Sequence, residues 1–396
     1  MDKVVFETAA LSHLMYWVHN NIKMVDKIYE LIRLYKQAGF SVKTVVTENA
    51  LNFISPLVLE TLTNEKCYFE QYSPREDVEH IHLCDWADVF VVAPISANTI
   101  SKFATGICDN LLTSIFCAYM GSKKPILLAP AMNEGMLNNP IIQMNLDILD
   151  TYCEIAPTEK GFLACNKEGD GRLCNVEFLF QKTMRLIYQN KENNSKKVIV
   201  TIGGTKEAID NVRYISNYSS GRMGIALSDW AYYKGYDVCA ITTVAADRAY
   251  KTINVQSALE MLNEIQNREF DCLIMAAAVG DFRAENILDK KIEKSDIENN
   301  FDIKLVKNPD IVATIAKNKK ENQTIIGFCL GDENLLENAQ RKLEAKNLDC
   351  IVANDIKTAL NTDNNKVTIL KKDGTIFNIN LDIKERVARK ILEVCL

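Results

Sequence analysis

The chain has 396 residues, enough for two or three domains at roughly 100–200 residues each, and every domain of that size can bury its own core. Hydrophobic residues make up 47% and charged residues 25%, which excludes a disordered or low-complexity protein. The net charge of −6 argues against a general nucleic-acid binder. No apolar run approaches about 18 residues, and the start MDKVVFETAA lacks a signal-peptide pattern, so neither a membrane span nor export is expected.

The twelve cysteines are scattered along the chain. None forms a CxxC pair or a Cys/His cluster with the spacing of zinc ligands. We therefore expect reduced thiols in a cytoplasmic protein.

The first half alternates strand and helix patterns. Short apolar runs rich in β-branched residues predict buried strands at 40–47, 87–94 and 124–130. Apolar residues from Met24 to Tyr35 share one helical face, and Gly39 stands where that helix should stop. Residues 97–121 have the length and spacing of a second helix. This alternation predicts a parallel sheet covered by helices on both faces.

After a polar linker at 189–197, the same alternation restarts. Buried strands are predicted at 197–204, 237–245, 271–279, 324–330 and 349–355, and helices at 223–235, 308–319 and 334–347. Asp373–Gly374 between two alternating runs predicts a hairpin. The fold class is therefore α/β: two doubly wound, Rossmann-like, three-layer domains, at 1–189 and 190–396.

Ligands of open α/β sheets bind beyond the carboxyl ends of the strands, and two polar segments follow strands in the first half. These are APISANT (93–99) and APAMNEGMLNNP (129–140), in which Asn98 and Asn133 are best placed to bind a ligand. Helix N-capping is an equally good explanation of both asparagines. His80 and His82 precede a strand, where a structural role is the commoner alternative to a catalytic base.

Cys165 lies in the glycine-rich segment GFLACNKEGDGR, which favours an exposed thiol able to donate a proton, although most lone cysteines are small core residues.

In this order and spacing, EHIHL, WAD, APISANTISKFATGICDNLL, PAMNEGM and GFLAC resemble the FMN-dependent phosphopantothenoylcysteine decarboxylases. The resemblance implies a flavoprotein-type domain that binds FMN through Thr47, Ser96, Asn98 and Thr99. It implies that His80 is the essential histidine, that Asn133 holds the substrate carboxylate and that Cys165 donates a proton. The chain departs from the family pattern at Leu137, where the family has tryptophan, and at Asn166, where it has glycine.

The start of the chain departs further. Lys27 and the segment DKIYELIRLYKQAGFSV match the family, but residues 11–25 contain no glycine where the family has its FMN phosphate loop. Two alternatives follow: a ligase whose N-terminal domain is only a scaffold, or a non-catalytic flavoprotein-fold regulatory module.

The second half contains two loops suited to phosphate oxygens. Gly203–Gly204–Thr205 ends a predicted strand, and Ser219–Ser220–Gly221 precedes a predicted helix. Ordinary turns would explain either loop alone, but Asp210, Arg213 and Asn217 lie between them. Asp281 follows another strand and is a candidate ligand for a ribose hydroxyl or Mg²⁺. Lysines follow at 290, 291, 294 and 307, where a solvated surface is the alternative.

These motifs, with GFCLGDEN and DCIVAND, resemble the phosphopantothenate–cysteine ligases, which are CTP-dependent in bacteria, over nearly all of 197–396. The resemblance implies an acyl-cytidylate intermediate held by Asn217, and a substrate site that includes Asp210, Arg213, Ser219, Ser220 and Gly221. It implies Mg²⁺ at Asp281, catalysis by Lys291, and a nucleotide site made of Met275, Ala276, Ala277, Asp281, Lys291, Lys307, Asn308, Pro309, Asp310, Phe328, Lys342 and Lys346. Departures occur at Arg222, Glu293 and Gly331–Asp332.

Both resemblances in one chain, in this order, match the bifunctional enzymes of bacterial coenzyme A synthesis. They imply the small-molecule substrates 4'-phosphopantothenate, cysteine and CTP, no nucleic-acid or membrane partner, and a cytoplasmic homo-oligomer.

Overall fold

The computed structural model describes residues 3–7, 22–71, 78–162, 168–189, 191–193, 195–291, 302–331, 334–356 and 362–396. The chain divides into two compact units, Met1–Tyr188 and Gln189–Leu396. None of the helices within the described ranges has the length and hydropathy needed to cross a membrane.

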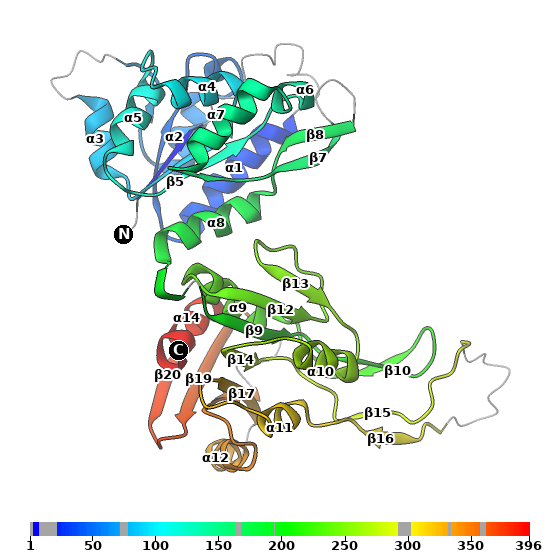
Figure 1. Ribbon diagram of the computed structural model, residues 1–396. Helices are drawn as coiled ribbons and strands as arrows, with labels where there is room; N and C mark the ends of the chain where they lie inside the picture. The colour runs from blue at the N-terminus through cyan, green and yellow to red at the C-terminus, as the bar shows by residue number, and fades with distance from the viewer. Residues whose placement is uncertain are drawn as a thin grey trace. The chain divides into compact units, whose positions relative to one another are not determined.

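The first unit is a parallel sheet with strand order β3-β2-β1-β4-β5-β6 (Figure 1). Its strands are β1 (Lys3–Glu7), β2 (Ser41–Val45), β3 (Cys67–Tyr68), β4 (Val89–Ile95), β5 (Ile126–Pro130) and β6 (Glu154–Ile155), followed by an antiparallel hairpin of β7 (Thr158–Phe162) and β8 (Glu168–Leu173). All seven residues of β4 are buried, which explains its unbroken apolar sequence. The three strands predicted in this half are confirmed as β2, β4 and β5.

Helices cover both faces of this sheet (Figure 1). They are α1 (Ile22–Gln37), α2 (Pro56–Thr63), α3 (Glu79–Trp86), α4 (Ala97–Thr105), α5 (Leu111–Met120), α6 (Glu134–Leu137), α7 (Pro140–Asp150) and α8 (Val176–Tyr188), with a short 3-10 turn η1 (Ala50–Asn52). Helix α1 packs beside α8, α3 beside α5, and α4 beside α7.

The single helix predicted over 97–121 is wrong, because the structure has two helices there. Gly106 ends α4 in the left-handed region at φ 71°, and its backbone N–H donates to the carbonyl oxygens of Lys102 and Phe103. Asn110 then starts α5 with a capping box, in which its side chain accepts from the Thr113 N–H. The break allows Phe103 and Phe116 to stack in the core with ring centroids 3.7 Å apart.

The second unit repeats the same strand order and extends it, giving β13-β12-β9-β14-β17-β18-β19-β20. Its main strands are β9 (Lys197–Ile202), β12 (Asp237–Thr242), β13 (Lys251–Asn254), β14 (Cys272–Met275), β17 (Thr324–Gly331), β18 (Cys350–Asp355), β19 (Asn364–Lys371) and β20 (Ile376–Ile383). The strands from β13 to β18 are parallel, and β19–β20 is the antiparallel hairpin predicted at Asp373–Gly374.

The rest of the second unit consists of two short ribbons and the helices. The ribbons pair β10 (Lys206–Ala208) with β11 (Tyr214–Ser216) and β15 (Phe282–Ala284) with β16 (Leu305–Lys307). The helices are η2 (Lys191–Asn193), α9 (Arg222–Tyr233), α10 (Ala258–Gln266), α11 (Ile311–Ala316), α12 (Leu335–Ala345) and α14 (Lys384–Cys395). Helices α9 and α14 pack together on one face, and α10, α11 and α12 cover the other.

Candidate functional site

The second unit contains a cavity of about 890 Å³ at the carboxyl ends of its parallel strands. The wall comes from the loop that enters α9, the segments after β14 and β16, strands β17 to β19, and helices α12 and α14. Parallel strands with order 3-2-1-4-5-6 leave their ligand crevice at this edge. The predicted residues that line the cavity are Asn217, Ser219, Ser220, Gly221, Met275, Ala276, Ala277, Asp281, Lys307, Asn308, Pro309, Asp310, Phe328, Lys342 and Lys346.

Three predicted residues stand apart from this wall. Asp210 and Arg213 are not among the lining residues, and the exposed Lys291 adjoins the undescribed residues 292–301. The buried Asp210 carboxylate accepts the N–H groups of Val212 and Arg213, at 2.7 and 2.6 Å, and the Arg213 guanidinium at 2.7 Å. This contact network stabilises the turn that leads into Asn217.

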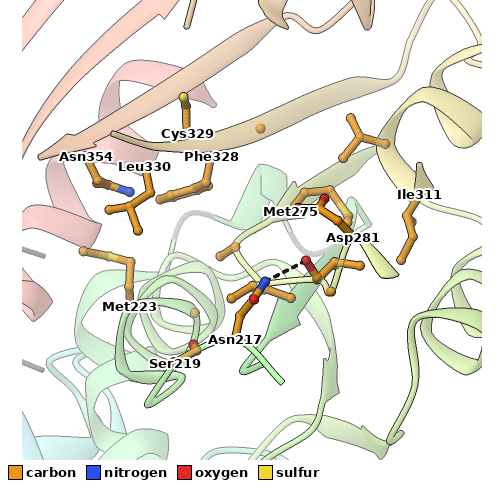
Figure 2. A pocket seen from close by; sticks show the side chains of 18 of the residues that line it. Asn217, Ser219, Met223, Met275, Asp281, Ile311, Phe328, Cys329, Leu330 and Asn354 are labelled. Carbon is orange, nitrogen blue, oxygen red and sulfur yellow. Dashed lines mark hydrogen bonds between the residues drawn. The ribbon is translucent and has the colours of Figure 1, made fainter. Parts of the chain in front are cut away.

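Side-chain hydrogen bonds hold the loops around the cavity together. The Asn217 amide donates to the Val279 carbonyl at 3.0 Å, and the Asn308 amide donates to the Gly280 carbonyl at 2.8 Å. The Thr205 hydroxyl accepts the Gly280 N–H at 2.8 Å. Figure 2 shows Asn217 and its bond at the centre of the cavity. The central amide is therefore positioned before any ligand binds.

Two glycines permit close approach at this point. A Cβ on Gly204 would stand 2.6 Å from the Asn217 carbonyl oxygen. Gly221 caps α9 at φ 73°, a conformation that other residues rarely adopt. The loops predicted at 203–205 and 219–221 are thus packed against one another, which needs glycine at both positions.

Cations gather where α11 and α12 meet the cavity. The Lys346 ammonium lies 2.7 Å from Asp310, whose side chain also caps α11 at the Ala313 N–H. Burial opposes ionisation of Asp310, but the Ala313 N–H and Lys346 outweigh it, so the pKa of Asp310 is lowered. The Lys342 ammonium lies 3.6 Å from the Cys329 sulfur. These two lysines form a positive wall suited to phosphate groups.

The wall also contains residues that the sequence analysis missed. They are Arg222, Met223, Asn354, Asn365 and Lys384. Asn354 is the one with a sequence signal, because it is the polar residue near the end of a buried strand. Lys384 begins a helix far along the chain, and no local pattern marks it.

In the first unit, the strand order reverses between β1 and β4, and sheets of this class bind their ligands at the carboxyl ends of the strands beside such a reversal. Ser96 caps α4 and accepts the Thr99 N–H at 3.3 Å, while Asn98 is exposed in the first turn. Thr47 follows β2, and its hydroxyl accepts the Ala50 N–H at 3.3 Å. Polar residues thus follow the carboxyl ends of two strands of the same sheet: Thr47 follows β2, and Ser96, Asn98 and Thr99 follow β4.

Asn133 follows β5 and caps the short helix α6, where its carbonyl oxygen accepts the Gly135 N–H at 2.9 Å. The hairpin β7–β8 approaches this loop so closely that the Met132 N–H donates to the Gly171 carbonyl at 2.9 Å. Cys165, between these two strands in sequence, lies outside the described residues.

His80 and His82 lie on helix α3, which precedes strand β4, so they come shortly before a strand as the sequence predicts. His80 is half-buried in the first turn of α3, and His82 is exposed.

Within the described ranges, no group of three or more His, Cys, Asp or Glu side chains has the arrangement of a metal site. The described cysteines are all free thiols. Most of them are buried, and Cys108 and Cys117 are exposed.

Comparison with known proteins identifies both halves. Residues 18–188 match the Flavoprotein family, and residues 193–396 match the DNA/pantothenate metabolism flavoprotein C-terminal domain. The chain is 38% identical over 391 residues to the coenzyme A biosynthesis bifunctional protein CoaBC of Borreliella burgdorferi, covering 96% of this chain and 98% of the relative.

Two further relatives are similar to this chain over most of its length. The protein of the same name from Bacillus subtilis is 36% identical, with 90% of each chain covered. A cysteine/cysteine sulfinic acid decarboxylase from an unknown prokaryotic organism is 37% identical and covers 86% of this chain and 98% of its own. Identity and coverage at these levels across both halves show that the chain belongs to the family of bifunctional coenzyme A biosynthesis proteins.

Proposed function

We propose that residues 190–396 ligate 4'-phosphopantothenate to cysteine with CTP, and that residues 1–189 decarboxylate the product to 4'-phosphopantetheine with FMN. The observation that carries the ligase assignment is the cavity around Asn217, in which the Asn217 amide, the lysine wall and the loop 219–221 meet. Family membership supports the pairing of the two activities in one chain.

The ligase reaction has two steps that match this cavity. A carboxylate oxygen of the substrate attacks the α-phosphorus of CTP, and pyrophosphate leaves, which gives an acyl-cytidylate. The cysteine amine then attacks the acyl carbon, CMP leaves, and the amine loses a proton. Lys342, Lys346 and Lys307 stabilise the charge on the departing pyrophosphate, and the Asn217 amide positions the acyl-cytidylate.

We place Mg²⁺ at Asp281. The described residues offer no cage of three ligands, and Mg²⁺ bound with a nucleotide needs only one or two carboxylates together with phosphates and waters. Among the described residues of the cavity wall, Asp310 is the other acid, and it is paired with Lys346. Asp281 is therefore the better ligand for the metal. The cytosine ring would meet the backbone of Met275 to Ala277 and the ring of Phe328.

The polar residues after β2 and β4 suit FMN in their donor set, because Thr47, Ser96, Asn98 and Thr99 offer hydroxyl and amide groups at the carboxyl ends of these strands. When bound, FMN supplies reversible two-electron oxidation of the substrate thiol, which makes the neighbouring carboxylate a leaving group. Asn133 would orient that carboxylate, and Cys165 would return a proton. His80 would act as the essential acid–base residue.

An absorbance spectrum of the purified full-length protein tests the cofactor assignment. Flavin bands near about 370 and 450 nm, at close to one FMN per chain, are the expected result. A colourless protein that still releases pyrophosphate with phosphopantothenate, CTP and cysteine would contradict it. That result would identify a ligase with a scaffold N-terminal domain.

We further propose a cytoplasmic homo-oligomer. Helix α7 exposes Ile141, Met144 and Ile148, which follow one helical face and suit contact with a second copy. Light scattering during size-exclusion chromatography should give a multiple of the chain mass of 44.7 kDa. Met144→Lys should lower the measured mass, whereas Lys390→Met on α14 should leave it unchanged. A monomeric wild type would refute the proposal.

A further inference from the structure

The segment that carries Asp281, the acid proposed to bind Mg²⁺, is held by side chains from outside that segment. Asp281 lies between the end of β14 and strand β15, on the side of the cavity opposite Met223 and Asn354 (Figure 2). Asp281 is exposed, so packing around its side chain does not fix it. Its place in the cavity therefore depends on the backbone on either side of it.

That backbone is bound from two directions. The Gly280 N–H donates to the hydroxyl of Thr205, a fully buried residue, at 2.8 Å. The Gly280 carbonyl accepts the side-chain amide of Asn308 at 2.8 Å, and the Asn308 backbone N–H donates to the Asp281 carbonyl at 2.9 Å. The carbonyl groups of Gly280 and Asp281 are thus both held by Asn308.

Arg283 fixes the orientation of Asn308 in turn. Its guanidinium donates to the Asn308 side-chain oxygen at 3.2 Å and to the Lys307 carbonyl at 2.7 Å. The carboxamide of Asn308 therefore has its oxygen bound by Arg283 and its nitrogen bound by Gly280. A carboxamide engaged at both ends cannot rotate without losing a hydrogen bond. Removal of Arg283 would free the oxygen of Asn308 and loosen its hold on the Asp281 segment.

The contacts of Arg283 lead to one side of the cavity only. Arg283 is half-buried on β15, opposite Val306 of β16, and it does not belong to the described wall of the cavity. The wall residues that it orders, Lys307 and Asn308, belong to the proposed nucleotide site. The Asn217 amide is held separately, by the Val279 carbonyl.

We propose that Arg283 is a positioning residue for the Mg²⁺–CTP side of the ligase cavity. By holding Asn308, it keeps the Asp281 backbone and Lys307 in place for the metal and the triphosphate. The inference rests on the proposed ligase function and on the placement of Mg²⁺ at Asp281. Residues that orient a metal ligand from behind contribute about 10- to 100-fold to metal affinity or activity.

The first test measures pyrophosphate release while Mg²⁺, CTP and phosphopantothenate are varied in turn. Arg283→Ala should raise the KM for CTP and the Mg²⁺ concentration at half-maximal rate, each by about 10-fold or more. The KM for phosphopantothenate should stay within about twofold, because Asn217 does not depend on Arg283. Lys304→Ala is the matched control, because it removes a cation that directly precedes β16, is 76% exposed and pairs with Glu285. It should behave as the wild type.

The second test needs no turnover. Titration calorimetry compares CTP binding with and without Mg²⁺. Mg²⁺ should tighten CTP binding to the wild type, and Arg283→Ala should reduce this gain by about 10-fold. Added guanidinium ion should restore part of the gain in Arg283→Ala, because it can replace the missing hydrogen-bond donor, and should leave the wild type unchanged.

The outcomes separate a positioning role from a general structural one. Equal increases in KM for CTP and phosphopantothenate would overturn the inference, as would wild-type dependence on Mg²⁺ in Arg283→Ala. If Arg283→Ala does not fold, Arg283→Lys keeps the charge and most of the volume, and it should still raise the Mg²⁺ requirement; unchanged dependence there would overturn the inference. A wild type whose CTP binding is indifferent to Mg²⁺ would instead refute the metal placement, and one that releases no pyrophosphate would refute the ligase assignment.

Discussion

Gly204→Ala tests the close packing of Gly204 against the backbone of Asn217, beside the ligase cavity. Gly204 is not in the left-handed region, so alanine is compatible with its backbone. The new methyl group would stand 2.6 Å from the Asn217 carbonyl oxygen, where ordinary contact begins at 3.4 Å. The oxygen is a backbone atom and the methyl group is bonded directly to backbone, so neither can turn away. The Asn217 loop must therefore move by about 0.8 Å, or the backbone at Gly204 must move away from it.

This displacement should be costly for catalysis. Misplacing a reacting group by about 1 Å lowers rates by about 100-fold, so we expect kcat/KM for ligation to fall about 10- to 100-fold, or about 1.4–2.7 kcal/mol. Overpacking should also lower the free energy of unfolding by about 1–3 kcal/mol. The assay is pyrophosphate release, with thermal unfolding measured on the same samples.

Gly121→Ala is the matched control, because Gly121 ends α5 at φ −70° and its Cβ would lie 3.6 Å from the Ala118 carbonyl oxygen. It should leave ligation unchanged and alter stability by less than about 1 kcal/mol. Full ligase activity in Gly204→Ala, with the protein folded, would refute the argument that the Asn217 loop must stay in place.

Three further results are expected. Asn217→Asp places a negative charge beside the acyl-phosphate, and Lys291→Gln removes a proposed catalytic cation. Each variant should abolish pyrophosphate release and leave carbon dioxide release from phosphopantothenoylcysteine intact. Normal coupled turnover in either variant would contradict the site. Phe103→Ala removes the buried ring stacked on Phe116 and should destabilise the first unit by about 3–5 kcal/mol in urea unfolding, against less than about 0.5 kcal/mol for the exposed Ile107→Ala. The pKa of Asp310 is lowered in the folded protein. Its ionised form therefore stabilises the fold fully at pH values above the ordinary aspartate pKa of about 3.9, and this stabilisation is lost as the pH falls through the lowered pKa. The loss of stability on Lys346→Met should therefore be greatest near neutral pH and vanish in acid, and a difference independent of pH would refute the pairing.

Both sheets could be predicted from the sequence because their central strands are buried on both faces and read as continuous apolar runs. All the residues of β4 and β14 are buried, for example, and a burial requirement on both faces permits few other sequences. The helix boundary at 106–110 was missed because a glycine and an asparagine inside a helical pattern are tolerated, and only the stacking of Phe103 on Phe116 shows why the chain turns there.

The residues of the ligase cavity also fall into two groups: those that the sequence indicated and those that only the structure revealed. Asn217, Asp281, Asp310 and the two glycine loops lie in strand-to-helix segments, where the sequence alone indicated ligand binding because parallel strands present their carboxyl ends at one edge. Lys384 and Asn365 come from the last hairpin and helix, and reach the cavity only because β19 and β20 extend the sheet and bring α14 against α9. Long-range packing of this kind leaves no local periodicity in the sequence, so only the tertiary structure revealed that Lys384 and Asn365 line the cavity.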